Sequence, residues 1–458
     1  MSISLVTESF QSLELHVKGN VCTMACAGHD SSQKITRNRT ATTVMLPKPC
    51  NTEEKKQEES FPDGGLQAWS QVFMGHLMNF NTWGYINSFG LFGAHYINNL
   101  HFSASAVAWI GSVQIFLLFF IGVVSGSALD AGYYRQVLIT GCFFQIFGIF
   151  MTSLATTYWE IFLAQGICQG IGHGLVFAPT VGLVATYFSK HRSLAVAITT
   201  GGSGTGGVVF VLLAKYLSPV LGFQWTVRIM GFVVLFNALI IISLVRPRLM
   251  ERNIGSIFDW KAFKELPYTL FVIGMFFSLW PVFYDFTFIN IFTTNVIGTP
   301  SSRSLTPLLI INAVSLPGRV ISGVIADRIL GSLNTLILLI LICAFLNFVW
   351  ISISTYGGIL AFVTVLGLIN GALQSMFISA LSSLTSDMSK IGRRSGMVMA
   401  AIAFSTLTGG PIAGSLIEKD GGGFLGVQIF GGTIMLVGCG IMITARVAKT
   451  GWVVIERL

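Results

Sequence analysis

The sequence predicts an all-α membrane protein with twelve transmembrane helices in two six-helix halves. Of its 458 residues, 53% are hydrophobic and only 10% are charged, compared with roughly 25% charged residues in an ordinary soluble domain. Apolar runs long enough to cross a bilayer follow one another through most of the chain. A glycine and an aspartate, Gly126 and Asp130, recur as Gly323 and Asp327 after a displacement of 197 residues, which indicates an internal duplication.

Each transmembrane helix needs about 20 apolar residues to cross roughly 30 Å of hydrocarbon. The approximate cores of the twelve predicted helices are 69–93, 105–128, 136–155, 160–187, 194–216, 226–245, 268–296, 305–326, 333–353, 358–385, 395–416 and 424–445. The division between the ninth and tenth is an inference. Residues 329–386 carry no charged side chain, and these 58 residues suit two crossings joined by the turn Ser-Thr-Tyr-Gly-Gly at 354–358.

The duplication divides the chain into an N-terminal half at 63–245 and a C-terminal half at 267–446, joined by a cytoplasmic linker at 246–266. Residues 1–62 are rich in Ser, Thr, Lys and Glu, a composition typical of a disordered tail. Residues 447–458 would form a short C-terminal tail. Both tails are predicted to be cytoplasmic.

The charges of the loops predict the orientation. The loops and tail on the predicted inner side carry 15 Lys and Arg residues, whereas the outer helix ends carry four. Because basic loops favour the cytoplasmic side, we expect a multi-pass protein of the plasma membrane with both termini inside. The linker has Trp260 and Phe263 among its charges, as an amphipathic stretch at the membrane surface would.

Several other functions find no support in the sequence. The basic residues lie singly or in short groups between apolar runs, so we expect no nucleic-acid partner. The seven cysteines show neither paired spacing nor a histidine at metal-ligand distance, so we expect no metal site. No nucleophile or pair of catalytic carboxylates stands out, and we expect neither a cofactor nor enzyme activity.

Glycines are concentrated in two of the predicted helices. They are Gly166, Gly170, Gly172, Gly174 and the glycines of 201–207. These stretches resemble phosphate loops at first sight. They lie inside apolar segments without a following Lys-Ser or Lys-Thr, so we expect them to allow close packing of helices instead.

The repeated motif carries a family resemblance. Gly126-Ser-Ala-Leu-Asp130-Ala-Gly-Tyr-Tyr-Arg135 resembles the loop between the second and third helices of the major facilitator superfamily. Gly323-Val-Ile-Ala-Asp327-Arg328 resembles its counterpart in the second half. The resemblance implies the major facilitator fold, in which two halves alternate in opening a central site to either side of the membrane.

Further stretches are similar to one branch of this superfamily. Asp63-Gly-Gly-Leu-Gln-Ala-Trp69 resembles the opening signature of the monocarboxylate porter family. Tyr187-Phe-Ser-Lys-His-Arg192, followed by the glycines of 201–207, resembles that family's signature across the fourth and fifth helices. The residues from Trp83 to Gly90 are similar to its fungal branch, and the match covers roughly 63–446.

The repeated loops are the predicted gating elements. Glycine would allow close helix approach, and the carboxylate would cap a helix N-terminus or pair with a basic residue when the inner gate is shut. The residues to which we assign this role are Gly126, Asp130, Arg135, Gly323, Asp327 and Arg328.

Two charges lie inside predicted helices, where each costs at least ~2.5–3.5 kcal/mol at the bilayer centre. The resemblance places Arg319 on the arginine that binds the substrate carboxylate, and a guanidinium can hold a carboxylate with two hydrogen bonds. A permanent pairing of Arg319 within the bundle is the alternative. Asp285 lies at a comparable depth and is the natural partner for Arg319 in an empty cavity. The resemblance places Asn87 where animal members have a first-helix lysine, and the predicted substrate-binding residues are Arg319, Asp285, Asn87 and Tyr284.

Other polar residues of the predicted helices are candidates for a polar path. They are Tyr284, Asn290, Asn312, Asn370 and Gln374. His76 and His173, which also lie in predicted helices, are either hydrogen-bonded packing residues or a proton relay, and the sequence leaves both interpretations open.

The sequence therefore predicts a secondary active transporter that moves a small organic anion, a monocarboxylate, together with protons by alternating access. Its partners would be this substrate, protons and the lipid bilayer, and an accessory membrane protein is left open. One alternative is an efflux transporter for a fungal secondary metabolite. Another, from a different class, is a non-transporting membrane sensor of nutrients.

Overall fold

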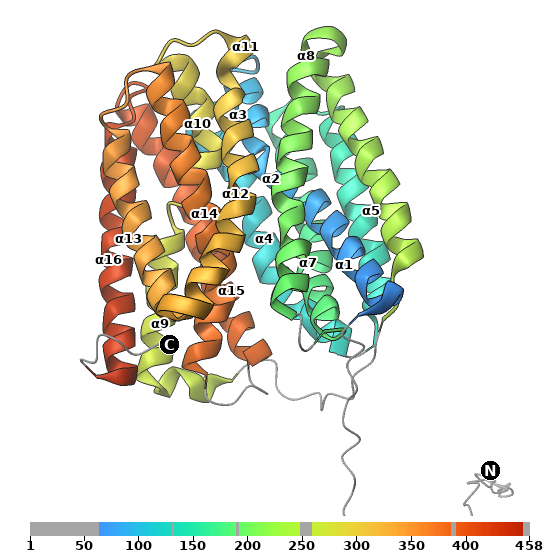
Figure 1. Ribbon diagram of the computed structural model, residues 1–458. Helices are drawn as coiled ribbons and strands as arrows, with labels where there is room; N and C mark the ends of the chain where they lie inside the picture. Colours follow the sequence, from blue (N-terminus) through green and yellow to red (C-terminus); the bar gives the residue numbers. More distant parts are fainter. Residues whose placement is uncertain (1–63, 131, 189–191, 248–258, 386–390, 452–458) are drawn as a thin grey trace, which may run out of the picture. The chain divides into compact units, whose positions relative to one another are not determined.

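The computed structural model describes residues 64–130, 132–188, 192–247, 259–385 and 391–451, which form helices and short connections without a strand (Figure 1). The predicted tail at 1–62 and most of the predicted linker lie outside these ranges. The start of the first helix and the end of the last lie at the same end of the helical bundle in Figure 1. This agrees with an even number of crossings.

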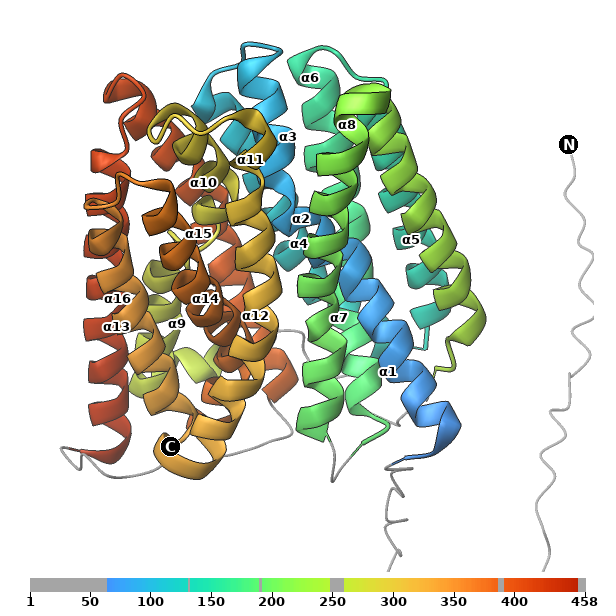
Figure 2. The same ribbon diagram turned by 45° about the horizontal axis from the view of Figure 1, so that its top comes forward.

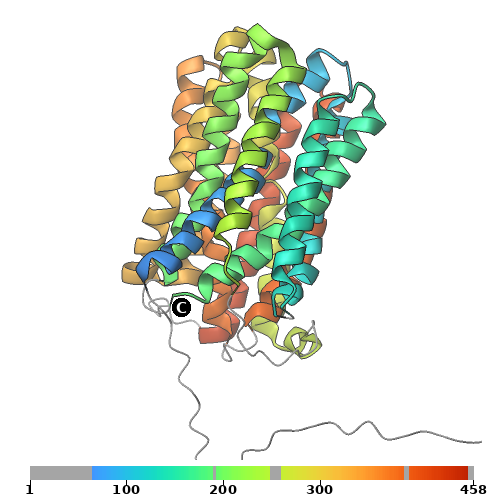
Figure 3. The same ribbon diagram turned by 90° about the vertical axis from the view of Figure 1, so that its right-hand side faces the viewer.

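The first half, residues 64–247, contains ten helical elements, three of which are short. They are α1 (Gly65–Asn79), η1 (Phe80–Gly84), α2 (Tyr85–Asn87), α3 (Phe89–Asn98), α4 (Ala104–Asp130), α5 (Tyr134–Thr152), α6 (Tyr158–Ile161), η2 (Phe162–Cys168), α7 (Gln169–Ala185) and α8 (Arg192–Leu244). In Figures 2 and 3, α1 runs obliquely beside α8, against which it packs.

The second half, residues 259–451, repeats this pattern. Its elements are η3 (Trp260–Lys264), α9 (Leu266–Leu279), α10 (Tyr284–Asn295), α11 (Ser301–Ser304), α12 (Thr306–Ile325), η4 (Ala326–Leu330), α13 (Ser332–Trp350), α14 (Tyr356–Leu384), α15 (Ile391–Lys419) and α16 (Leu425–Thr450). The predicted ninth and tenth helices are α13 and α14, separated by the turn at residues 351–355.

Ten helices within the described ranges are long and apolar enough to cross a membrane. One of them, Leu194–Leu244, holds two predicted spans because the chain reverses at Gly222 (Figure 1). Gly222 has φ of 78°, a conformation that glycine adopts without strain. The first predicted span, 69–93, is divided among α1, η1, α2 and α3 and so forms no single long helix. The ten helices, one of which holds two spans, and the divided first span together give the twelve predicted crossings.

The first and seventh crossings are interrupted at equivalent places. Trp83 and Trp280 are 197 residues apart, the displacement of the repeated loop motif. Around Trp83, the Ser88 hydroxyl donates to Tyr85 O at 2.7 Å, and such local bonds compete with the helix ladder. Trp280 begins the turn that separates α9 from α10, where Pro281 supplies no backbone N–H.

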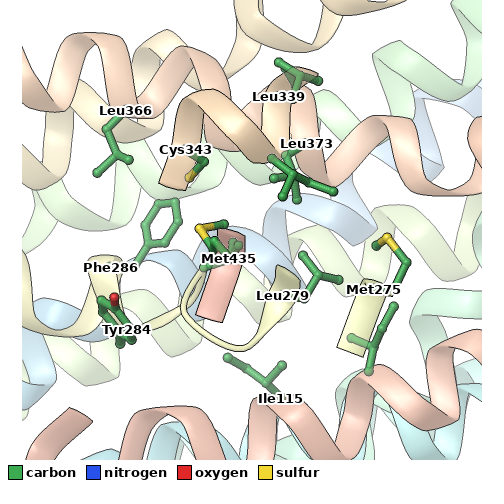
Figure 4. Close-up of a cluster of buried hydrophobic side chains, with 14 of the residues drawn as sticks. Ile115, Met275, Leu279, Tyr284, Phe286, Leu339, Cys343, Leu366, Leu373 and Met435 are labelled. Carbon is green, nitrogen blue, oxygen red and sulfur yellow. The ribbon is translucent and has the colours of Figure 1, made fainter. Parts of the chain in front are cut away.

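Each half has its own apolar core. Two buried clusters lie almost wholly in the first half, and the largest cluster gathers most of its residues from the second. Figure 4 shows part of the largest cluster, in which Phe286, Cys343 and Met435 approach one another from different helices. The largest cluster also includes Trp83, Ile115 and Phe119 of the first half, so it extends across the contact between the halves.

The glycine-rich stretches pack helices closely, as predicted. A Cβ atom at Gly172 would lie 2.7 Å from Gln145 N, and one at Gly206 would lie 2.9 Å from the Cα of Phe80. Gly206 also faces Gly84, whose Cβ would lie 2.6 Å from the Gly206 Cα. Larger residues at these positions would push the helices apart.

Candidate functional site

A cavity of about 500 Å³ lies between the two halves. Its walls come from α1, η1, α4, α7 and α8 in the first half, and from α9, the α9–α10 turn, α12, η4, α14 and α15 in the second. The polar residues in its lining are Asn79, Thr200, Ser203, Arg319, Asp327, Gln374, Ser375, Ser379 and Ser382. Of the lining residues in the described ranges, Arg319 and Asp327 alone are charged.

The cavity reaches one end of the bundle. Its lining runs along α12 from Arg319 through Gly323 to Asp327, which is exposed, and includes Ile391 at the start of α15. We call this end the Asp327 end. Its side of the membrane is predicted by the loop charges to be the cytoplasm.

The opposite end is closed by contacts between the halves. There is no room for a Cβ atom at Gly90, which abuts the carbonyl of Phe286. The Asn290 amide donates to Gly90 O at 3.5 Å. The carboxylate of Glu418 accepts a hydrogen bond from Ser105 N at 2.7 Å, at the start of α4. The structure is therefore a conformation open at the Asp327 end alone.

Arg319 is held on α12 with its guanidinium at the cavity wall. Its Nη2 donates to Gln374 Oε1 at 3.2 Å, and its buried Nε has no hydrogen-bond partner. The residue is 8% exposed and makes no ion pair with any residue that the structure describes. A buried cation with an unused donor favours binding of an anion. Permanent pairing of Arg319 with a carboxylate is absent from the described part of the chain.

Asp285 does not line the cavity, contrary to the prediction. It is 1% exposed. Its Oδ2 accepts a hydrogen bond from Asn370 Nδ2 at 3.4 Å, and its Oδ1 has no partner. The direct pair between Asp285 and Arg319 is not formed here. The break before α10 turns Asp285 toward α14 and the core of the second half. The prediction used only the equal depth of the two residues in the membrane, which does not show the direction of a side chain.

Tyr284 and Asn87 also lie away from the cavity. The Tyr284 hydroxyl donates to Asn347 Oδ1 at 2.8 Å within the second half, and Figure 4 shows it in the apolar core. Asn87 is 2% exposed and its Oδ1 has no partner. It borders a separate void of about 10 Å³ that Phe283 also lines. Helical periodicity was insufficient to place these side chains because the first and seventh crossings are interrupted.

One of the five candidates for a polar path, Gln374, lines the cavity. The other amides have partners elsewhere: Asn290 at Gly90, Asn312 at Leu308 O and Asn370 at Asp285.

The two histidines are hydrogen-bonded within the first half. His76 lies 2.8 Å from Ile198 O and 3.0 Å from Thr205 Oγ1 through its two ring nitrogens. His173 lies between Gln114 and Gln145, at 3.1 and 2.9 Å. These contacts agree with packing roles.

The predicted gating residues lie at the Asp327 end. Gly323 and Asp327 border the cavity, whereas Arg135 and Arg328 are exposed. The side chain of Asp130 lies outside the described residues. Among the described residues, no atom lies within 4 Å of a Cβ built at Gly126 or at Gly323, so these residues do not show the predicted close approach.

An aromatic group at the inner limit of the cavity was missed by the sequence analysis. Trp83 packs against Phe119, Phe177 and Phe283, with ring centroids 5.5 to 5.6 Å apart, and all four residues line the cavity. Trp83 and Phe283 come from different halves. The only sequence signal was the position of both residues at the interruptions of the first and seventh crossings.

The fold and the cavity define a two-half membrane transporter. The chain belongs to the Major Facilitator Superfamily, whose family profile matches residues 72–390. The solved nucleoside transporter NupG shares this fold, with a TM-score of 0.62 at 15% identity over 84% of this chain and 100% of that chain.

Relatives in fungi are more similar in sequence. An MFS-type transporter of Gibberella zeae is 42% identical, covering 84% of this chain and 88% of the relative. The aspyridones efflux protein apdF of Emericella nidulans is 37% identical, covering 83% of this chain and 78% of the relative. The superfamily prediction is confirmed. The narrower assignment to the monocarboxylate porter family stays a prediction.

Proposed function

We propose that this protein exports an acidic fungal secondary metabolite of drug-like size. The observation that carries the proposal is the cavity of about 500 Å³ that presents the Arg319 guanidinium among mainly apolar walls. Cavities of roughly 300–1,000 Å³ suit drug-sized ligands. A small monocarboxylate would leave most of this space to water, so the cavity favours the efflux alternative over the uptake of small acids.

Charge complementarity supports an acidic substrate. Arg319 has no carboxylate within ion-pair distance in the described residues, and its bond to Gln374 leaves its Nε unused. A substrate carboxylate or an acidic enol would supply the missing negative charge. The named function of the apdF relative, efflux of aspyridones, supports the direction and the substrate class.

The open end supports loading from the cytoplasm. If the loop charges orient the protein as predicted, the substrate enters at Asp327 and meets Arg319 deeper in the cavity. Export then requires the Asp327 end to close and the contacts at Gly90 and Glu418 to separate. We propose that proton entry drives this cycle, as the family resemblance implies.

Comparison of a deletion strain with its parent tests the proposal. The medium and the cells would be extracted separately and analysed by mass spectrometry. We expect at least one acidic metabolite to move from the medium into the cell extract on deletion, and to return to the medium when the native gene is restored. Restoration with Arg319→Gln is the matched control and should fail at equal protein abundance.

A second measurement separates the alternatives. Purified protein in liposomes with an imposed pH gradient would be offered labelled acetate, labelled lactate and the acidic metabolite. Fast movement of the small acids without competition by the metabolite would contradict the proposal and favour monocarboxylate transport. Binding of small acids without movement of any compound would favour the nutrient sensor.

A further inference from the structure

Trp83, Phe119, Phe177 and Phe283 form one aromatic group at the inner limit of the cavity. The rings of Trp83 and Phe283 are stacked, with an interplanar angle of 20° and centroids 5.6 Å apart. Phe119 is inclined to Trp83 by 57° and Phe177 by 79°. Trp83 and Phe119 are 7% and 5% exposed, whereas Phe177 and Phe283 are half-buried. The ring surface left for a ligand therefore comes mainly from Phe177 and Phe283, with Trp83 and Phe119 packed behind them, and aromatic ligands prefer to contact such faces and edges.

The backbone holds Trp83 in this position. Trp83 belongs to η1, a π-helical turn, and such turns are frequent at functional sites. Gly84 lies behind it against Gly206, where a Cβ atom would come within 2.6 Å of the opposing Cα. The turn is therefore pressed against α8 at Gly84, and the Trp83 indole next to it lines the cavity.

The polar groups on the first-half wall are already occupied. The Asn79 amide donates to Gly75 O at 3.0 Å, and the Ser203 hydroxyl donates to Thr200 O at 2.9 Å. Arg319, which lines the cavity and makes no ion pair with a described residue, is left as the main polar anchor in its depth. A ligand that matches this surface has one acidic group, and the rest of the molecule forms few hydrogen bonds.

We infer that the aromatic group is a subsite for a flat, conjugated ring system, and that the substrate is an aromatic or conjugated organic acid anchored at Arg319. This inference rests on the proposed function and names its substrate class. A saturated acid of equal size would fill the same volume without the ring contacts. Each aromatic pair contributes about 0.5–1.5 kcal/mol beyond area burial, so the flat acid should bind roughly 3- to 10-fold more tightly.

The test measures binding by calorimetry, with the full-length protein in lipid nanodiscs and no transport step. The probes are 2-naphthoate and its fully saturated analogue, decahydronaphthalene-2-carboxylate. Wild type should prefer 2-naphthoate by roughly 3- to 10-fold, and Trp83→Leu should reduce the preference below about 2-fold. Arg319→Gln should weaken the binding of both acids by the same factor, because it removes the guanidinium that anchors the carboxylate and leaves the aromatic group unchanged.

Trp280→Leu is the matched control. It removes an indole at the equivalent interruption of the second half, where Trp280 packs against Phe276 and Phe430 outside the cavity lining. We expect the preference for 2-naphthoate to survive this change. If Trp83→Leu does not fold, Phe177→Leu serves in its place, because Phe177 is only half-buried and its loss disturbs packing less.

Equal binding of the two acids to wild type would overturn the inference. So would a preference that persists unchanged in both Trp83→Leu and Phe177→Leu. These outcomes are distinct from failure of the proposed function. If the protein prefers 2-naphthoate but its deletion leaves secretion unchanged, the export proposal is contradicted and the aromatic subsite is kept. If the exported compound is a saturated acid, only the aromatic subsite is contradicted.

Discussion

Asp285 and Arg319 are held by two amides of α14 that lie one helical turn apart, Asn370 and Gln374. The two charged residues therefore meet the same helix without forming an ion pair in this conformation. Arg319 lines the cavity while Asp285 faces the core. Their energetic coupling should pass through α14 rather than through a direct contact.

We predict that Asp285→Asn leaves protein abundance unchanged or raised, because a neutral amide is cheaper to bury than a carboxylate with an unpartnered Oδ1. Asn370→Leu should lower stability by about 1–3 kcal/mol, since it leaves Asp285 without its hydrogen bond. Expression level gives the abundance of Asp285→Asn, and thermal unfolding of the purified variants gives the change in stability. The double variant should recover much of the loss, and additive losses would contradict the contact.

Arg319→Lys should lose most binding of an acidic substrate. Lysine keeps the charge but lacks the planar fork that holds a carboxylate with two hydrogen bonds. Gln374→Leu should weaken binding less, because it frees a donor of Arg319 but removes its positioning contact. Calorimetry with 2-naphthoate gives the order, and wild-type affinity in Arg319→Lys would exclude a bidentate anchor.

Asp327→Asn should slow turnover with little change in substrate affinity, because Asp327 lies at the exposed mouth of the cavity and Arg319 in its depth. Asp130→Asn should behave alike if the duplicated loops share a role. Initial rates over a range of substrate concentrations separate the two parameters. Normal turnover in both variants at native abundance would remove the gating role.

Arg394 is a buried residue that fixes the start of α15 to the chain before α9. It binds Glu265 through two nitrogens at 2.8 and 2.5 Å, and lies 3.5 Å from Asp259 and 5.4 Å from the centre of the Tyr268 ring. Arg394→Ala should destabilise the protein by about 1–2 kcal/mol, since it removes a buried partner of two acids, one of which, Glu265, is 49% exposed and partly screened by solvent. Arg393→Ala, at the neighbouring half-buried residue, is the control, and equal melting temperatures for the two would contradict this role.

Glu418 should help to keep the end opposite Asp327 closed. Its carboxylate accepts from Ser105 N at the first turn of α4, and the loss of such a cap costs about 0.5–2 kcal/mol. Glu418→Ala should therefore increase the population open at that end. Spin-label distances between α4 and α15 report the change, with exposed Lys419→Ala as the control, and unchanged distance distributions would contradict the prediction.

The sequence by itself determined the all-helical membrane fold, the position of most crossings and the superfamily. Long apolar runs have few ways to satisfy their backbone in lipid except as helices, and the repeat of Gly126 and Asp130 at Gly323 and Asp327 marks the duplication. It also singled out Arg319 as a candidate, because a charge among apolar residues stands out in the sequence.

Only the tertiary structure decided which polar residues share the cavity. The π-helical turn Phe80–Gly84 and the turn at Pro281 rotate the following segments, so helical periodicity no longer relates the residues on either side. As a result, the cavity is lined by Trp83 and Phe283 and not by Asp285, Tyr284 or Asn87. The direction in which a side chain points in a membrane bundle depends on these local breaks and on glycine contacts between helices. Both depend on packing among residues that are far apart in the chain.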